Sequence, residues 1–173
     1  MASTTDFESL VKLHYRALYQ FGFSLTRSDA DACDLTQQTF YLWAAKGHQL
    51  LDHSKVKSWL FTTLHREFLK QHRKLVQFPH HELSQVDDEL PTVPPAVMEA
   101  LDGKAVLQTL AQVDEQYRAP LALFYLGQHS YKEITELLDL PMGTVQSRIA
   151  RGKAQLLHML GDEPPSTGPG NAT

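Results

Sequence analysis

The sequence predicts an all-α protein, and three observations support this class. Apolar residues recur at three- and four-residue spacing along most of the chain. Runs of alternating β-branched residues, which are typical of strands, are missing. A proline-rich, acidic stretch interrupts the helical pattern near the middle. We therefore expect two small helical domains over residues 1–75 and 97–160. A flexible acidic linker at 76–96 would join them, and 161–173 would form a disordered tail.

Composition narrows the class of protein further. The 173 residues contain a single cysteine, Cys33, so an internal disulfide is excluded and a reduced, cytoplasmic compartment is expected. No uncharged apolar run approaches the roughly 18 residues of a membrane span, so no membrane insertion is predicted. The 9 histidines show no metal-binding spacing, and we expect them on the surface or in the linker. Because no nucleotide-binding or nucleophile motif is present, we expect no metal, no cofactor and no enzyme activity.

The first half is expected to form three helices. The first covers residues 6–26, and the second follows a polar break at 28–31, with Asp29 or Asp31 as its cap, and ends near Gly47. The third covers 55–74 and is strongly basic. Its cations, opposed within the helix by one acid, are Lys55, Lys57, Arg66, Lys70, Arg73 and Lys74. Such a segment in a protein of formal net charge −4 indicates a polyanionic partner at this place.

In the second half the helical pattern resumes near residue 97. A helix over about 121–126 is expected, with Pro120 near its start. Ser130 and Glu133 have the spacing of a capping box and predict a short helix. Pro141 then favours the start of a longer, basic helix. A short helix, a tight turn and a longer basic helix are typical of a helix-turn-helix.

The longer basic helix has two distinct faces on a helical wheel. One is a stripe that we expect to be buried, with Gly152 allowing close packing: Val145, Ile149, Gly152 and Leu156. The opposite face has small residues, including Ala150, with Gln146, Ser147 and Arg151 available to base edges. Thr144, Arg148 and Lys153 lie further round, where phosphates would be contacted. The simpler alternative is an amphipathic surface helix with a solvated basic face.

Two motifs in order resemble a known family. "YKEITELLDLPMGTVQSRIARGKAQL" is similar to region 4 of bacterial sigma-70 family factors of the extracytoplasmic-function (ECF) group, and "YRAPLALFYLGQHSYKEI" extends the match upstream. "DLTQQTFYLWA" resembles region 2.2, and "VKSWLFTTLHREFLKQHRK" resembles regions 2.3 and 2.4. The resemblance covers most of the chain. It implies a sigma factor that binds core RNA polymerase, directs it to promoters and helps to melt the start site.

The resemblance also implies partners for particular residues. Asp34, Gln37 and Gln38 would meet the clamp helices of the polymerase β′ subunit, whereas Phe40 is expected in the core. The six cations of the third helix would contact the minus-ten element, beside a base-capturing loop at about 46–54. The second domain would meet the β flap and the minus-thirty-five element. The residues implied at the latter element are Thr144, Gln146, Ser147, Arg148, Ala150, Arg151 and Lys153.

Some features depart from the family pattern or leave alternatives open. Arg66 and Lys70 replace the asparagine and aspartate that relatives often carry, so the minus-ten preference is expected to differ. The acidic linker would thread through the polymerase, or serve as a simple tether. An anti-sigma factor is an expected partner. Two other functions are alternatives: a stand-alone helix-turn-helix regulator that binds a palindrome as a dimer, and a sigma-like mimic that does not support transcription.

Overall fold

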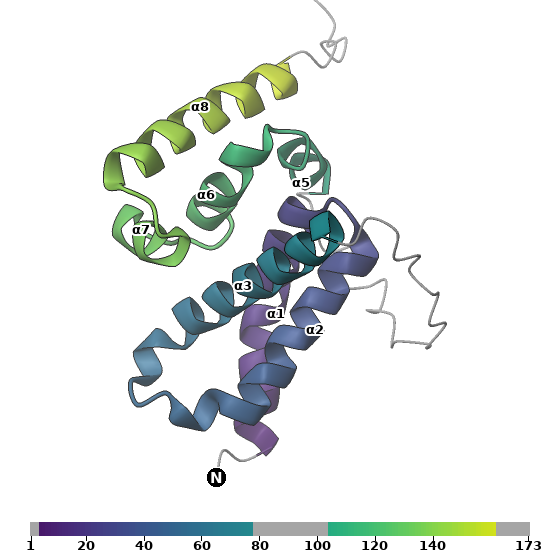
Figure 1. The fold of residues 1–173 in the computed structure, drawn as a ribbon, viewed down its shortest axis with the longest axis vertical. Helices are drawn as coiled ribbons and strands as arrows, with labels where there is room; N and C mark the ends of the chain where they lie inside the picture. The colour runs from purple at the N-terminus through teal and green to yellow at the C-terminus, as the bar shows by residue number, and fades with distance from the viewer. Residues whose placement is uncertain (1–3, 78–103, 162–173) are drawn as a thin grey trace, which may run out of the picture.

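The computed structural model describes residues 4–77 and 104–161, and within these ranges every regular element is a helix (Figure 1). The predicted all-α class is therefore confirmed. The predicted linker from residue 78 onward, the helical pattern near 97 and the tail from 162 lie outside the described residues. The elements are α1 (Thr4–Thr26), α2 (Asp29–Lys46), the short 3-10 helices η1 (Gly47–Gln49) and η2 (His53–Lys55), α3 (Val56–Gln77), α5 (Lys104–Leu110), α6 (Glu115–Tyr125), α7 (Tyr131–Leu138) and α8 (Met142–Gly161).

The first helical unit consists of α1, α2 and α3. The expected cap of α2 was wrong, because Ser28 has the extended backbone of an N-cap and its hydroxyl accepts a hydrogen bond from the Asp31 N–H at 3.3 Å. Asp29 and Asp31 lie instead in the first turn, where their negative charges favour the positive end of the helix dipole. The helix ends at Lys46, before Gly47, as predicted.

The second helical unit contains α5 to α8. Here the expected position of Pro120 was wrong, since α6 already begins at Glu115 and the proline lies inside the helix. A proline at such a position lacks the N–H that would close one helical hydrogen bond. The surrounding residues Tyr117, Leu121 and Ala122 are buried, and this packing holds the helix in spite of the missing bond.

The two units share one hydrophobic core. Helix α1 packs against α5 and α6, and α3 packs against α7, so that the second unit lies directly on the first (Figure 1). The largest completely buried side chains come from both units: Leu18, Phe21, Leu35, Leu60, Phe61, Leu64, Val113, Leu121, Leu123, Ile134 and Val145. Because each unit is too small for a large core of its own, this shared burial adds to the stability of both.

His129 lies at the junction of the units. The sequence placed the histidines on the surface or in the linker, but His129 is only 2% exposed, so that prediction was wrong for this residue. Its ring meets Phe61 of α3 edge-on, with 4.7 Å between the ring centroids. Nδ1 lies 3.3 Å from the Leu123 carbonyl oxygen. Burial lowers the pKa of His129, and the positive charge of Lys57 lowers it further.

Candidate nucleic-acid interface

The helix-turn-helix is formed by α7, a tight turn and α8. The Ser130 hydroxyl accepts a hydrogen bond from the Glu133 N–H at 3.2 Å, which caps α7 as the sequence predicted. The helix ends at Asp139, whose φ of 54° places it in the left-handed region. Pro141 precedes α8, and its carbonyl accepts from the Val145 N–H at 3.0 Å. The turn therefore fixes the direction in which α8 leaves α7.

One face of α8 is anchored in the core. Val145 is completely buried, Ile149 is 4% exposed, and Gly152 is also buried, while Leu156 packs at the margin of the core. A Cβ atom added at Gly152 would lie 3.0 Å from Cβ of Tyr117 on α6. The glycine thus permits the close approach of α6 and α8 that the sequence predicted.

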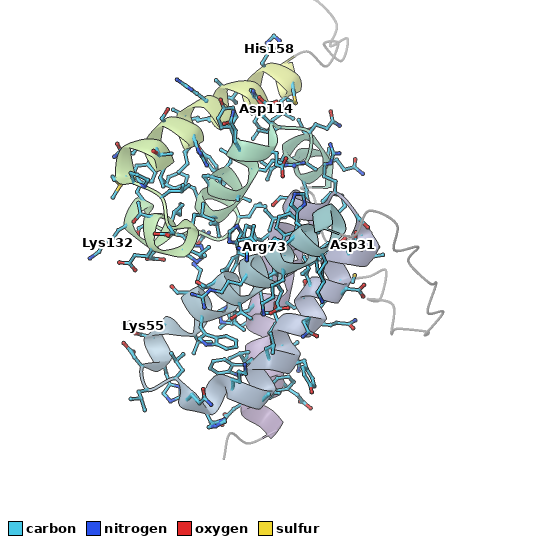
Figure 2. All side chains as sticks on the ribbon, in the orientation of Figure 1. Asp31, Lys55, Arg73, Asp114, Lys132 and His158 are labelled. Carbon is cyan, nitrogen blue, oxygen red and sulfur yellow. The ribbon has the colours of Figure 1, made fainter. Side chains whose placement is uncertain are left out.

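A polar pair adds to this anchoring. The Asp114 N–H donates to Gln155 Oε1 at 3.1 Å, and Gln155 Nε2 donates to Asp114 Oδ2 at 2.8 Å. Figure 2 shows Asp114, the N-cap of α6, beside α8. Sequence reasoning missed this pair, because the two residues are 41 positions apart and no local motif marks either of them. The pair links the C-terminal half of α8 to the start of α6.

The opposite face of α8 is open to solvent. Gln146, Ser147, Ala150, Arg151 and Lys153 are exposed, whereas Thr144 and Arg148 are partly buried at its margins. Helix α8 contains two arginines and a lysine but no acidic residue. An exposed helical face with small residues, hydrogen-bonding side chains and positive charge has the chemistry needed to enter a major groove.

The predicted minus-ten cations lie on η2 and α3, and five of the six are exposed. Lys55, Arg66 and Arg73 are exposed, and Figure 2 shows Lys55 and Arg73 near opposite ends of the helix. Lys57 is partly buried instead, and its charge lowers the pKa of both His14 and His129 in addition to the effect of burial. Lys57 therefore lies close enough to His129, at the junction of the two units, for its charge to act there.

A groove of about 510 Å³ runs between α2 and α3. Its walls contain the predicted polymerase-binding residues together with two of the predicted minus-ten residues: Asp34, Gln37, Gln38, Tyr41, Glu67, Lys70, Gln71 and Lys74. Lys70 forms a salt bridge with Glu67 at 3.0 Å. Burial raises the pKa of Asp34, and the nearby Asp31 carboxylate raises it further. Sequence reasoning missed Tyr41, which is 68% exposed and has no motif of its own.

Phe40 lies in the core as expected, whereas Trp43 and Trp59 are partly buried and pack against the core. Phe40 is 6% exposed and stacks on Tyr15, with 6.2 Å between the ring centroids. Trp43 and Trp59 meet edge-on at 5.2 Å. In contrast, Leu51 in the loop between α2 and α3 is 93% exposed. The loop therefore presents an apolar side chain to solvent.

Across residues 4–77 and 104–161, no group of three or more metal-ligating side chains comes together. Among the described helices, none is long and apolar enough to cross a membrane.

Both helical units match models of one protein family. The family model for sigma-70 region 2 matches residues 10–77, and that for sigma-70 region 4 matches residues 103–156. The chain is 27% identical over 155 residues to the ECF RNA polymerase sigma factor SigM of Bacillus subtilis, covering 86% of this chain and 91% of that protein. It is 24% identical over 160 residues to the sigma factor YlaC of the same organism, covering 90% and 92%.

Solved structures show the same arrangement of helices. The sigma factor RpoE of Bartonella quintana, solved in complex with the anti-sigma factor NepR, superposes with a TM-score of 0.71 at 28% identity, covering 93% of this chain and 100% of that one. CnrH, solved with the cytosolic domain of CnrY, gives a TM-score of 0.62 at 22% identity, covering 94% and 92%, and supports the fold alone.

The fold, the helix-turn-helix and the two family matches define a sigma factor. The chain belongs to the sigma-70 family, with region 2 in α1–α3 and region 4 in α5–α8. Within that family it is of the ECF type, as is SigM of Bacillus subtilis, which it matches over most of its length.

Proposed function

We propose that this chain acts as a sigma factor that binds core RNA polymerase and brings it to specific promoters. The observation that carries the proposal is the exposed, acid-free face of α8 on a helix-turn-helix, combined in one chain with the groove between α2 and α3. A binding protein of this kind positions DNA and polymerase, while the polymerase performs the chemistry. Its place of action would be the cytoplasm, where core polymerase works.

Region 4 would read the minus-thirty-five element through α8. Gln146, Ser147 and Arg151 would face base edges, with Ala150 allowing close approach to the floor of the groove. Thr144, Arg148 and Lys153 would contact phosphates along the edges of the helix. The second unit would also meet the polymerase β flap.

Region 2 would bind the minus-ten element and the polymerase. The outward-facing Arg66 and Arg73 of α3 would contact promoter phosphates, with Lys55 near the start of the helix. The exposed loop that contains Leu51 would lie beside the melted strand, where an extruded base needs a pocket. Asp34, Gln37 and Gln38 would meet the β′ clamp helices from the groove.

A protein antagonist is part of the proposal. RpoE, the solved relative at 28% identity, is held by an anti-sigma factor. Because the superposition includes the whole of the RpoE chain, the present chain would offer comparable surfaces to such a regulator. We therefore propose an anti-sigma factor as its negative regulator.

Run-off transcription tests the proposed function. Purified chain and core polymerase would be incubated with fragmented genomic DNA, and the 5′ ends of the transcripts would be mapped. We expect discrete start sites that share upstream sequence elements and that vanish when the chain is omitted. Sequence-specific binding to DNA without polymerase, together with no discrete start site, would instead favour a stand-alone regulator.

A further inference from the structure

The groove between α2 and α3 has a charge pattern that suits protein better than DNA. Its walls bring the lysines Lys70 and Lys74 together with the carboxylates of Asp34 and Glu67. A DNA backbone repeats one negative charge at each phosphate, so two carboxylates in the same groove would repel it. A protein surface can place acidic groups opposite the lysines and donors opposite the carboxylates.

The positions on α3 place Lys70 and Lys74 on a face that adjoins the one with Arg66 and Arg73. The α3 residues that line the groove recur at i, i+3, i+4 and i+7 and therefore form one stripe along the helix: Glu67, Lys70, Gln71 and Lys74. This stripe is one wall of the groove, and α2 provides the other. Arg66 and Arg73 are seven residues apart and therefore share a face. At 100° per residue that face points away from the buried residues of α3, which are Leu60, Phe61 and Leu64.

The groove also offers an anchor for a protein partner. Tyr41 is 68% exposed on its wall, and an exposed tyrosine is a frequent contact in protein interfaces because it combines apolar area with a hydroxyl. The salt bridge between Lys70 and Glu67 is solvent-exposed on the lysine side, so its contribution is small and it can be exchanged for a partner's carboxylate. Helices α2 and α3 run side by side in opposite directions (Figure 1), and four residues of each line the groove, so a partner helix would meet both helices at once.

We propose that Lys70 and Lys74 contact carboxylates on a helical surface of mixed charge on core RNA polymerase, and not promoter DNA. This rests on the proposed function as a sigma factor, and it narrows the minus-ten contacts of α3 to the face that carries Arg66 and Arg73. Lys70 and Lys74 join Asp34, Gln37, Gln38 and Tyr41 in one protein-binding surface.

Two double variants of the full-length chain test this assignment. In one, Lys70→Ala and Lys74→Ala remove charge from the groove; in the other, Arg66→Ala and Arg73→Ala remove the same charge from the outer face. Lys12→Ala, at an exposed site on α1, controls for the loss of a positive charge elsewhere. Thermal unfolding followed by circular dichroism verifies that every variant folds.

Two measurements separate the roles. Titration of labelled chain with core polymerase measures the affinity of each variant for polymerase. Promoter affinity is then measured at several salt concentrations with preassembled holoenzyme, in which the polymerase is saturated with the variant. We expect the double lysine variant to bind polymerase about tenfold more weakly, with an unchanged salt slope on DNA. The double arginine variant should keep its affinity for polymerase. The slope of its log promoter affinity against log salt concentration should become smaller in magnitude by about two, because two phosphate contacts are lost.

The opposite pattern would overturn the assignment. If the double lysine variant binds core polymerase as tightly as the unaltered chain and its holoenzyme has a reduced salt slope, Lys70 and Lys74 are DNA contacts. In that case the sigma-factor function would stand. If the unaltered chain itself fails to bind core polymerase, the proposed function and this inference both fail.

Discussion

The rings of Phe61 and His129 meet edge-on with their centroids 4.7 Å apart, which joins α3 of region 2 to the loop before α7 of region 4. This contact lies where the two helical units share their core, and His129 is buried with no partner at Nε2. A charged imidazole at this place would put a second N–H in an apolar site close to Lys57. The contact therefore depends on a neutral histidine.

Stability should consequently fall in mild acid. Burial lowers the pKa of His129, and burial also lowers the pKa of His65 to about 4. A histidine whose pKa is lower in the folded protein stabilises the fold fully above the unfolded value of about 6.5, and this stabilisation is lost as the pH falls toward the folded value. For His65 we expect a loss of about 2 kcal/mol between pH 7.5 and pH 5. Urea unfolding at both pH values measures it.

Replacing the buried histidine should weaken this pH dependence. His129→Gln removes the titrating group, so the difference in unfolding free energy between pH 7.5 and pH 5 should shrink relative to the unaltered chain. His48→Gln, at an exposed position, is the matched control and should leave the difference as it is. An unchanged difference in the His129 variant would mean that its ring is not held neutral by the fold.

A larger side chain at Gly152 should destabilise region 4. The added atoms of Gly152→Val would press against Tyr117 and Leu121, since even a Cβ lies 3.0 Å and 3.3 Å from their nearest atoms. We expect a loss of about 1–3 kcal/mol from overpacking. Gly143→Ala in the same helix meets nothing within 4 Å and should be neutral or stabilising by up to about 1 kcal/mol. Chemical denaturation compares the two, and equal losses would argue against close helix packing as the cause.

Loss of the hydrogen bonds between Asp114 and Gln155 should weaken the packing of α8 on α6 and lower the free energy of unfolding. Gln155→Ala removes both hydrogen bonds, and we expect about 1 kcal/mol of destabilisation because the pair is partly exposed. A double-mutant cycle with Asp114→Ala isolates the interaction energy of the two side chains. Strict additivity of the two single changes would show that the side-chain contact contributes nothing.

Arg151 and Lys153 should differ in their effect on promoter choice. Arg151→Ala should cost about 1–3 kcal/mol at one or two bases of the minus-thirty-five element, because a guanidinium can bond to a base edge. Lys153→Ala should weaken binding about equally on all sequences. Holoenzyme binding to a library of promoter variants measures both. A uniform loss for Arg151→Ala would make it a phosphate contact.

Local sequence was sufficient to predict those structural features whose signal lies within one or two helical turns. The helical periods predicted the all-α class, the Ser130–Glu133 spacing predicted the start of α7, and the apolar stripe of α8 predicted its buried face. These features depend on neighbours three or four residues away, whose geometry the helix itself fixes. Before α2, Ser28 and the aspartates that follow it are all good N-cap residues, and the prediction of an aspartate as the cap was wrong.

Only the tertiary structure decided how the pieces meet. A charge count groups Lys57, Lys70 and Arg73 together, but packing puts Lys57 at the junction with region 4, Lys70 in the groove with α2 and Arg73 on the outer face. The same packing turned His129 from an expected surface residue into a buried one. The reason is physical: a helix presents its side chains in every direction, and the neighbour that each one meets depends on segments distant in the sequence.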